Sequence, residues 1–152
     1  MMRMCQFGGF SAGMLLLCIG LAGCIAKPSF GPGPADPDAP TEFTETESGL
    51  KYRILRRGNG SKPAASNTVR VHYEGQLEDG TVFDSSYRTG KPTTFGLRQV
   101  IGGWTEGVQL VDVGGMIELL VPPELGYGAE GMPGAIPPGA TLRFKVELFE
   151  IL

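Results

Sequence analysis

The chain has 152 residues and a formal net charge of -3, with 13 Lys+Arg against 16 Asp+Glu. This length suits a single hydrophobic core, and the lack of a basic surplus excludes binding to nucleic acid through phosphate contacts. The 24 glycines and 12 prolines favour a turn-rich domain built on a sheet over a bundle of helices.

Residues 1 to 23 predict an export signal. Arg3 is followed by an apolar run centred on residues 14 to 21, and small residues close it. The letters "LAGC" at 21 to 24 resemble the lipobox of bacterial lipoproteins, which implies cleavage before Cys24 and a lipid on its sulfur. The alternative is an uncleaved helix over residues 7 to 26, long enough to cross a hydrocarbon core of about 30 Å.

The lipobox predicts a protein that is anchored by its lipid in the cell envelope. Ile25 and Ala26 lack the aspartate that retains some lipoproteins at an inner membrane, which favours the outer membrane and a domain facing the periplasm. All three cysteines lie in the first 24 residues, so the rest of the chain can form neither a disulfide nor a thiolate metal site.

Residues 24 to 47 predict a flexible tether. The segment is rich in proline, glycine and acidic residues and has little periodic apolar character, so it cannot bury enough surface to offset its ordering entropy. The folded domain is therefore expected over residues 48 to 152. No heptad pattern precedes it, and we expect a monomer.

The first half of the domain predicts strands. Tyr52 and Ile54 indicate one strand near the start. Residues 67 to 76 alternate, with Val69, Val71 and Tyr73 on one face and polar side chains on the other. The Asp79-Gly80 pair predicts a hairpin turn before the apolar pattern resumes at Val82 and Phe83.

The second half predicts one helix between strands. Apolar residues recur over residues 100 to 111 at the spacing of a short amphipathic helix, although three glycines interrupt it. A strand over residues 116 to 121 ends at Pro122-Pro123, a loop follows over 124 to 139, and an alternating strand covers 141 to 152. The sum is an α+β domain, an antiparallel sheet bent over one helix.

The stretch "VHYEGQLEDGTVFDSS" at residues 71 to 86 concentrates polar groups. A hydrolase needs a nucleophile, a base and an orienting group in contact, but this chain has neither a G-x-S-x-G elbow nor a second histidine. A metal site needs ligands at a suitable spacing, which His72 lacks. We expect His72, Glu74, Glu78 and Ser86 to face solvent or support turns, and we expect no metal.

Three blocks carry a resemblance to a known family: "VHYEGQLEDGTVFDSS", "QVIGGWTEGVQLV" and "VPPELGYGAEGMPGAIPPGATLRFKVELFEI". They resemble, in order and spacing, the signature blocks of the FKBP-type peptidyl-prolyl cis-trans isomerases, over about Gly49 to Leu152. The resemblance implies a strongly curved antiparallel sheet, a half-barrel, wrapped around one short helix. It also implies an apolar pocket that accelerates rotation about X-Pro bonds without a cofactor.

The resemblance assigns the site residues. The catalytic set it implies is Tyr73, Phe83, Asp84, Trp104, Tyr127 and Phe144, with Trp104 as the floor. The substrate-binding set it implies is Phe95, Val100, Ile101, Ala135 and Ile136. Departures from many relatives lie at the rim, at Thr93, Met132 and Ala135, and we expect them to alter substrate preference and drug affinity rather than the basic activity.

The resemblance also implies partners. Exported polypeptides that contain proline would be the substrates, and macrolides such as tacrolimus and rapamycin would be inhibitors. The alternative to an isomerase is a module that binds proline peptides, or a holdase chaperone, with little turnover. An isomerisation assay separates the two.

Overall fold

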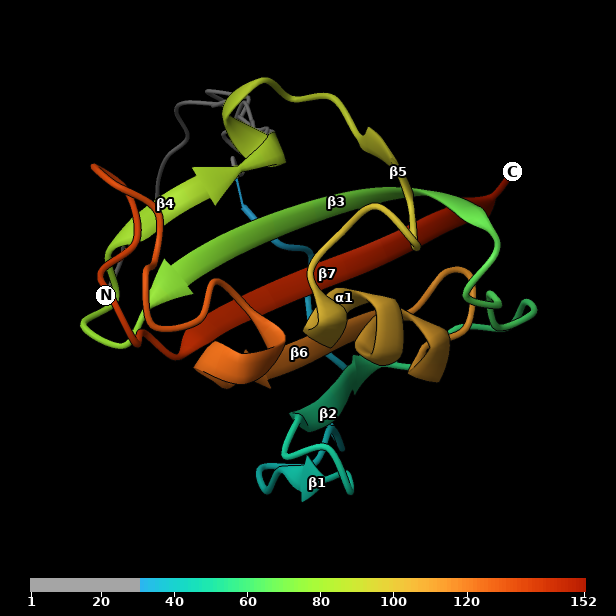
Figure 1. Cartoon of the computed structure of the whole chain (residues 1–152). Coiled ribbons are helices and arrows are strands. Elements are labelled where there is room, and N and C mark those ends of the chain that lie inside the picture. Colours follow the sequence, from blue (N-terminus) through green and yellow to red (C-terminus); the bar gives the residue numbers. More distant parts are fainter. Residues whose placement is uncertain (1–30) are drawn as a thin grey trace, which may run out of the picture.

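The computed structural model describes residues 31 to 152, which contain seven strands and one α-helix (Figure 1). The strands are β1 (Thr44–Glu45), β2 (Lys51–Arg56), β3 (Thr68–Leu77), β4 (Val82–Ser85), β5 (Thr93–Gly96), β6 (Met116–Val121) and β7 (Leu142–Ile151). The helix is α1 (Gly102–Gly107), and three 3-10 turns are η1 (Ser86–Arg88), η2 (Val108–Leu110) and η3 (Pro123–Leu125).

The strands form one antiparallel sheet in the order β1-β2-β6-β7-β3-β4. The two longest strands, β3 and β7, pair at its centre, while the short strands β4 and β5 share the other edge of β3. Figure 1 shows this sheet curving around α1, which lies in front of it. The predicted α+β class and curved antiparallel sheet are confirmed.

The core lies between the sheet and α1. The alternation read from the sequence holds in β3 and β7, where Val69, Val71, Val146 and Leu148 are fully or almost fully buried on the concave side. Gly80 has a φ of 85° in the β3–β4 turn, which is the left-handed conformation that the Asp-Gly pair predicted.

The glycines of α1 allow the helix to lie directly on β6. A Cβ on Gly103 would come within 2.5 Å of Val121, and one on Gly107 within 2.6 Å of Leu119. These two positions lie one turn apart on the buried face of the helix. Glycines lower the intrinsic stability of a helix, but here they let α1 lie directly against β6. The helix itself is shorter than predicted and continues as η2.

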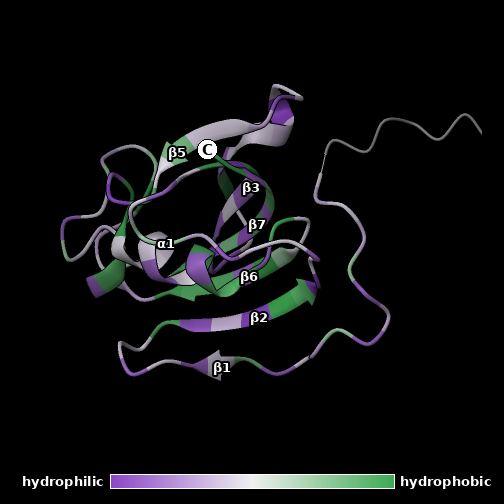
Figure 2. Cartoon of the chain, turned by 90° about the vertical axis from the view of Figure 1, so that its right-hand side faces the viewer, coloured by the Kyte–Doolittle hydropathy of each residue, from purple (hydrophilic) through white to green (hydrophobic). Residues whose placement is uncertain are grey.

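Residues 31 to 43, here called the N-terminal strap, cross the face of the sheet opposite α1. Figure 2 shows the strap on one side of the sheet and α1 on the other. This agrees with the strand alternation, because the strap contacts Glu147, which lies between the inward-facing Val146 and Leu148. After the strap, β1 adds to the edge of β2.

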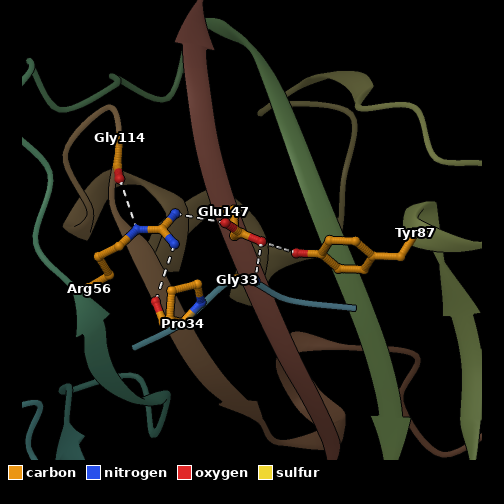
Figure 3. Close-up of polar contacts among 6 residues, drawn as sticks. All are labelled: Gly33, Pro34, Arg56, Tyr87, Gly114 and Glu147. Carbon is orange, nitrogen blue, oxygen red and sulfur yellow. Dashed lines mark hydrogen bonds and ion pairs between the residues drawn. The ribbon is translucent and has the colours of Figure 1, made fainter. Parts of the chain in front are cut away.

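Glu147 holds the strap to the convex face (Figure 3). Its carboxylate accepts hydrogen bonds from the Gly33 N–H at 2.9 Å, from the Arg56 guanidinium at 2.7 Å and from the Tyr87 hydroxyl. Arg56 also donates to the Pro34 carbonyl and to the Gly114 carbonyl. One buried carboxylate thus joins the strap, β2, β7 and η1.

Glu118 is a second buried carboxylate that helps to hold the strap, in this case through Arg53. Glu118, which is fully buried, accepts from Arg53 at 2.6 Å, and Arg53 donates to the Thr41 carbonyl at 2.6 Å. The guanidinium of Arg53 also lies 4.7 Å from the centre of the Phe43 ring. The strap is therefore fixed at both of its ends.

These contacts differ from the expected tether over residues 24 to 47. From residue 31 onward the segment packs on the domain, because its backbone carbonyls and N–H groups, together with the Phe43 ring, provide the anchors. Cys24 and the export signal lie outside the described residues. Within the described part of the chain, we find no helix with the length and hydropathy needed to span a membrane.

Candidate functional site

A cavity of about 470 Å³ lies between the concave face of the sheet, α1 and the loops beside them. Its size lies within the range of small-molecule sites. The lining is mostly aromatic and aliphatic: Tyr73, Phe83, Asp84, Phe95, Gln99, Val100, Ile101, Trp104, Tyr127 and Phe144. The structure therefore brings together nine of the eleven residues that the resemblance assigned.

Trp104 forms the floor of the cavity. It is 4% exposed, and its ring is approached edge-on by the rings of Tyr73 at 5.2 Å, Phe95 at 5.4 Å and Phe144 at 5.5 Å. Edge-to-face packing of this kind fixes ring orientation. The close contact of α1 with β6 sets the depth of this floor.

One wall is a hydrogen-bonded pair. The Tyr73 hydroxyl donates to the Asp84 carboxylate at 2.6 Å, across the β3–β4 hairpin. Burial, and then the hydrogen bond to Asp84, raise the pKa of Tyr73 above its ordinary value of 10.0. Tyr73 thus stays neutral at physiological pH, and the one carboxylate that lines the cavity has a partner.

The opposite wall depends on Gly75 of β3. The rings of Phe83 and Phe144 meet edge-to-face at 5.6 Å above this glycine. A Cβ on Gly75 would come within 2.6 Å of Phe83 and 2.8 Å of Phe144. The absence of a side chain here lets both rings lie against the strand.

The rim is partly polar. Tyr127 is 36% exposed and its side chain lines the cavity from the loop after η3. Gln99, which precedes Val100 and Ile101 in the chain, also lines the cavity and was not predicted. Its position within the "QVIGGW" block was the only signal, and the alternation of apolar residues gave no reason to select it.

Two assigned residues do not line the cavity. Ile136 is 3% exposed and belongs to the hydrophobic core, and Ala135 is exposed to solvent. The loop turns tightly here, with Met132 and Ile136 paired through backbone hydrogen bonds. That turn directs Ile136 inward and leaves Met132 at 38% exposure beside it.

The polar stretch 71 to 86 is only partly solvated. Ser86 is 4% exposed and bonds to the backbone of Tyr73, so the expectation that it faces solvent or supports a turn misses this contact. His72 stacks on Tyr87 with ring centres 4.6 Å apart, on the convex face. Among residues 31 to 152 no group of three histidine, cysteine or acidic side chains is arranged to hold a metal ion.

A curved antiparallel sheet around one short helix, with an aromatic cavity floored by a tryptophan, defines a class of peptide-binding isomerase domain. The model of one such family, described as FKBP-type peptidyl-prolyl cis-trans isomerase, matches residues 59 to 149. The chain belongs to this family.

Similar proteins support this assignment. The FKBP-type 22 kDa peptidyl-prolyl cis-trans isomerase of Escherichia coli (strain K12) is 52% identical over 107 residues, which are 70% of this chain and 52% of that protein. The outer membrane protein MIP of Legionella longbeachae is 50% identical over 104 residues, 68% of this chain and 45% of that protein. The chain thus spans about half the length of these curated relatives.

A solved structure gives the same fold. The crystal structure of FkpA from Escherichia coli aligns with a TM-score of 0.70 and 46% sequence identity. The alignment covers 74% of this chain and 52% of the FkpA chain. The likeness therefore concerns the domain described above, not the remaining half of FkpA.

Proposed function

We propose that this domain is a peptidyl-prolyl cis-trans isomerase that acts on exported polypeptides. The observation that carries the proposal is the cavity, whose floor and walls are aromatic and whose single carboxylate is bonded to Tyr73. Such a site offers an apolar ring a close fit and offers a reacting bond no free acid, base or nucleophile from the lining residues.

Rotation about an X-Pro bond breaks no covalent bond and transfers no proton, so an apolar cavity of this kind can accelerate it. The barrier of about 18 to 20 kcal/mol reflects the partial double-bond character of the C–N bond. In the twisted transition state this resonance is lost and the carbonyl oxygen carries less charge, so an apolar site disfavours it less than it disfavours the planar amide. The prolyl ring would rest on Trp104, between Tyr73, Phe83 and Phe144, which adds a preference for the twisted shape.

Polar groups at the border would fix the peptide. The Tyr127 hydroxyl would donate to a substrate carbonyl and set the register of the bound chain. Asp84 would act mainly by holding Tyr73, because its carboxylate is already within 2.6 Å of that hydroxyl.

The test is a protease-coupled assay on a short X-Pro peptide. We expect the wild type to exceed the uncatalysed rate, and Trp104→Ala and Phe83→Ala each to lose most of the gain. Phe149→Ala, on an exposed aromatic side chain outside the cavity, serves as the control and should retain the activity. A wild-type rate equal to the uncatalysed one would favour the proline-binding or holdase alternative.

We also propose that Cys24 carries a lipid that anchors the protein in the outer membrane. The "LAGC" sequence supports this, and the name of the Legionella relative, an outer membrane protein, agrees with it. Intact-mass measurement on membrane fractions tests it, with Cys24→Ser as the control. A wild-type chain that keeps its first 23 residues and has no added mass would contradict the proposal.

A further inference from the structure

One edge of β3 is interrupted beside the cavity. On this edge β5 pairs with β3 up to Val71, and β4 pairs with it from Glu74 onward. The two residues between them have no strand partner on that side. Buried backbone N–H and C=O groups need a hydrogen bond, so something else must satisfy Tyr73.

The hydroxyl of Ser86 fills this interruption. Its Oγ accepts from the Tyr73 N–H at 2.8 Å and lies 3.3 Å from the Tyr73 carbonyl oxygen, with the Nδ1 atom of His72 also at 2.8 Å. Ser86 is 4% exposed, so water does not readily replace it. A hydroxyl donates and accepts through one oxygen, which lets a single side chain take the place of a strand residue.

The same corner of the chain holds the other end of Tyr73. Asp84, two residues before Ser86, accepts from the Tyr73 hydroxyl at 2.6 Å. The β4–η1 corner therefore holds Tyr73 at its backbone and at its phenol. Between these two points, the Tyr73 ring lies against Trp104 and against Phe95, with ring centres 5.2 and 5.6 Å apart.

We propose that Ser86 is a positioning residue of the isomerase site, which acts by fixing Tyr73 and the β4–η1 corner relative to each other. The inference rests on the proposed isomerase function. If Tyr73 is held less firmly, the cavity still admits the substrate but fits the twisted transition state of the X-Pro bond less well. Loss of the hydroxyl should therefore lower kcat more than it raises KM.

Substitutions at Ser86 and at its neighbour Ser85 test the role of the hydroxyl. Ser86→Ala should lower kcat/KM by about fivefold to tenfold, the equivalent of one buried hydrogen bond, while Ser86→Thr should stay within about twofold of the wild type. Ser85→Ala is the matched control, because Ser85 is a buried neighbour whose hydroxyl makes no side-chain hydrogen bond within residues 31 to 152. It should retain the wild-type kcat/KM. Ser86→Cys replaces Ser86→Ala if the latter does not fold.

A double-mutant cycle with Tyr73→Ala separates positioning from general stabilisation. Without the Tyr73 side chain, Ser86→Ala should cause no further loss of kcat/KM, although it should still lower stability in denaturant, since the backbone of residue 73 remains. An equal loss of kcat/KM in both backgrounds, or no loss in the wild-type background, would overturn the inference.

Trp104 gives a readout that does not need turnover, because it is the only tryptophan of the chain. Ser86→Ala should change its emission in the folded protein, and Ser85→Ala should not. If the wild type fails to isomerise the peptide, the proposed function fails, and the emission of these two variants still decides whether Ser86 positions the cavity wall. Identical emission of wild type and Ser86→Ala would then contradict the inference.

Discussion

At the scale of single residues, Tyr127 offers the clearest polar contact for a ligand. It lines the cavity, and its hydroxyl makes no hydrogen bond to any other residue of the described chain. We expect Tyr127→Phe to weaken binding of a proline peptide or a macrolide by about fivefold, because one hydrogen bond to the ligand is lost. Titration followed by Trp104 fluorescence measures this.

The matched control for this change is Tyr52→Phe. Tyr52 lies in β2, away from the cavity, and removal of its hydroxyl should leave ligand affinity unchanged. If Tyr127→Phe binds as tightly as the wild type, the hydroxyl has no role in fixing the ligand.

Glu147 makes the stability of the domain depend on acidity. Burial opposes its ionisation, but hydrogen bonds from Tyr87, Gly33 and Arg56 outweigh burial and lower the pKa of Glu147 below 4.5. A lowered pKa in the folded state means that the stabilisation is complete above pH 4.5 and is lost as the pH falls through the folded value.

Glu147→Gln should therefore be less stable than the wild type at pH 7, by about 2 kcal/mol, and its stability should fall less steeply in acid. Denaturant unfolding between neutral and acid pH measures both effects. Glu45→Gln is the control, since Glu45 forms an exposed pair with Lys51 and such pairs contribute little. Equal acid sensitivity of Glu147→Gln and wild type would show that Glu147 does not carry this dependence.

At the scale of elements, α1 should respond to alanine in opposite ways at adjacent positions. Gly103→Ala places a Cβ 2.5 Å from Val121 and should destabilise the domain by about 1 to 3 kcal/mol, as overpacking does. Gly102→Ala meets Leu125 at 3.4 Å, an ordinary contact, and should be neutral or stabilising because alanine favours helix.

Thermal unfolding of the two alanine variants compares them directly. The Trp104 emission should change in Gly103→Ala, because the helix that carries the indole must shift, and stay constant in Gly102→Ala. Equal stability of the two variants would mean that the helix can move away from β6 without loss.

The elements that the sequence predicted are those with regular apolar spacing. Strands β3, β6 and β7 appear within one or two residues of their predicted bounds. Apolar residues alternate along β3 and β7, and β6 is a mostly apolar run bounded by Gly114-Gly115 and Pro122-Pro123. The short strands β1 and β5 escaped prediction, because two to four residues at a sheet edge carry too little pattern.

The site residues also divide into those that the sequence predicted and those that it did not. Its aromatic residues could be assigned through sequence blocks that the family shares, whereas the position of Ile136 depends on a turn that sequence spacing does not specify. The contact between Ser86 and Tyr73 was beyond prediction for a related reason. It depends on where two edge strands stop along β3, a property of strand pairing and not of composition.

At the scale of the whole molecule, the strap should belong to the folding unit. A chain that begins at residue 48 lacks the Gly33 donor to Glu147, the backbone acceptors for Arg53 and Arg56, and β1. We expect it to lose about 2 to 4 kcal/mol of unfolding free energy relative to a chain that begins at residue 31. Denaturant unfolding of the two chains tests this.

Isomerase activity of the shorter chain, measured well below its unfolding temperature, should remain near that of the longer one. No residue of the strap lines the cavity, so only the fraction folded should change. Equal stability of the two chains would show that residues 31 to 47 are a passive linker and not part of the folding unit.

The path of the strap also keeps the N-terminal part of the described chain away from the cavity. The strap crosses the convex surface, where Gly33 bonds to Glu147, while the aromatic cavity lies on the concave one. The contacts that hold the strap are therefore all on the face of the sheet turned away from the cavity. We therefore expect a polypeptide bound in the cavity to lie on the opposite side of the sheet from the strap, so that the strap does not block access to the site.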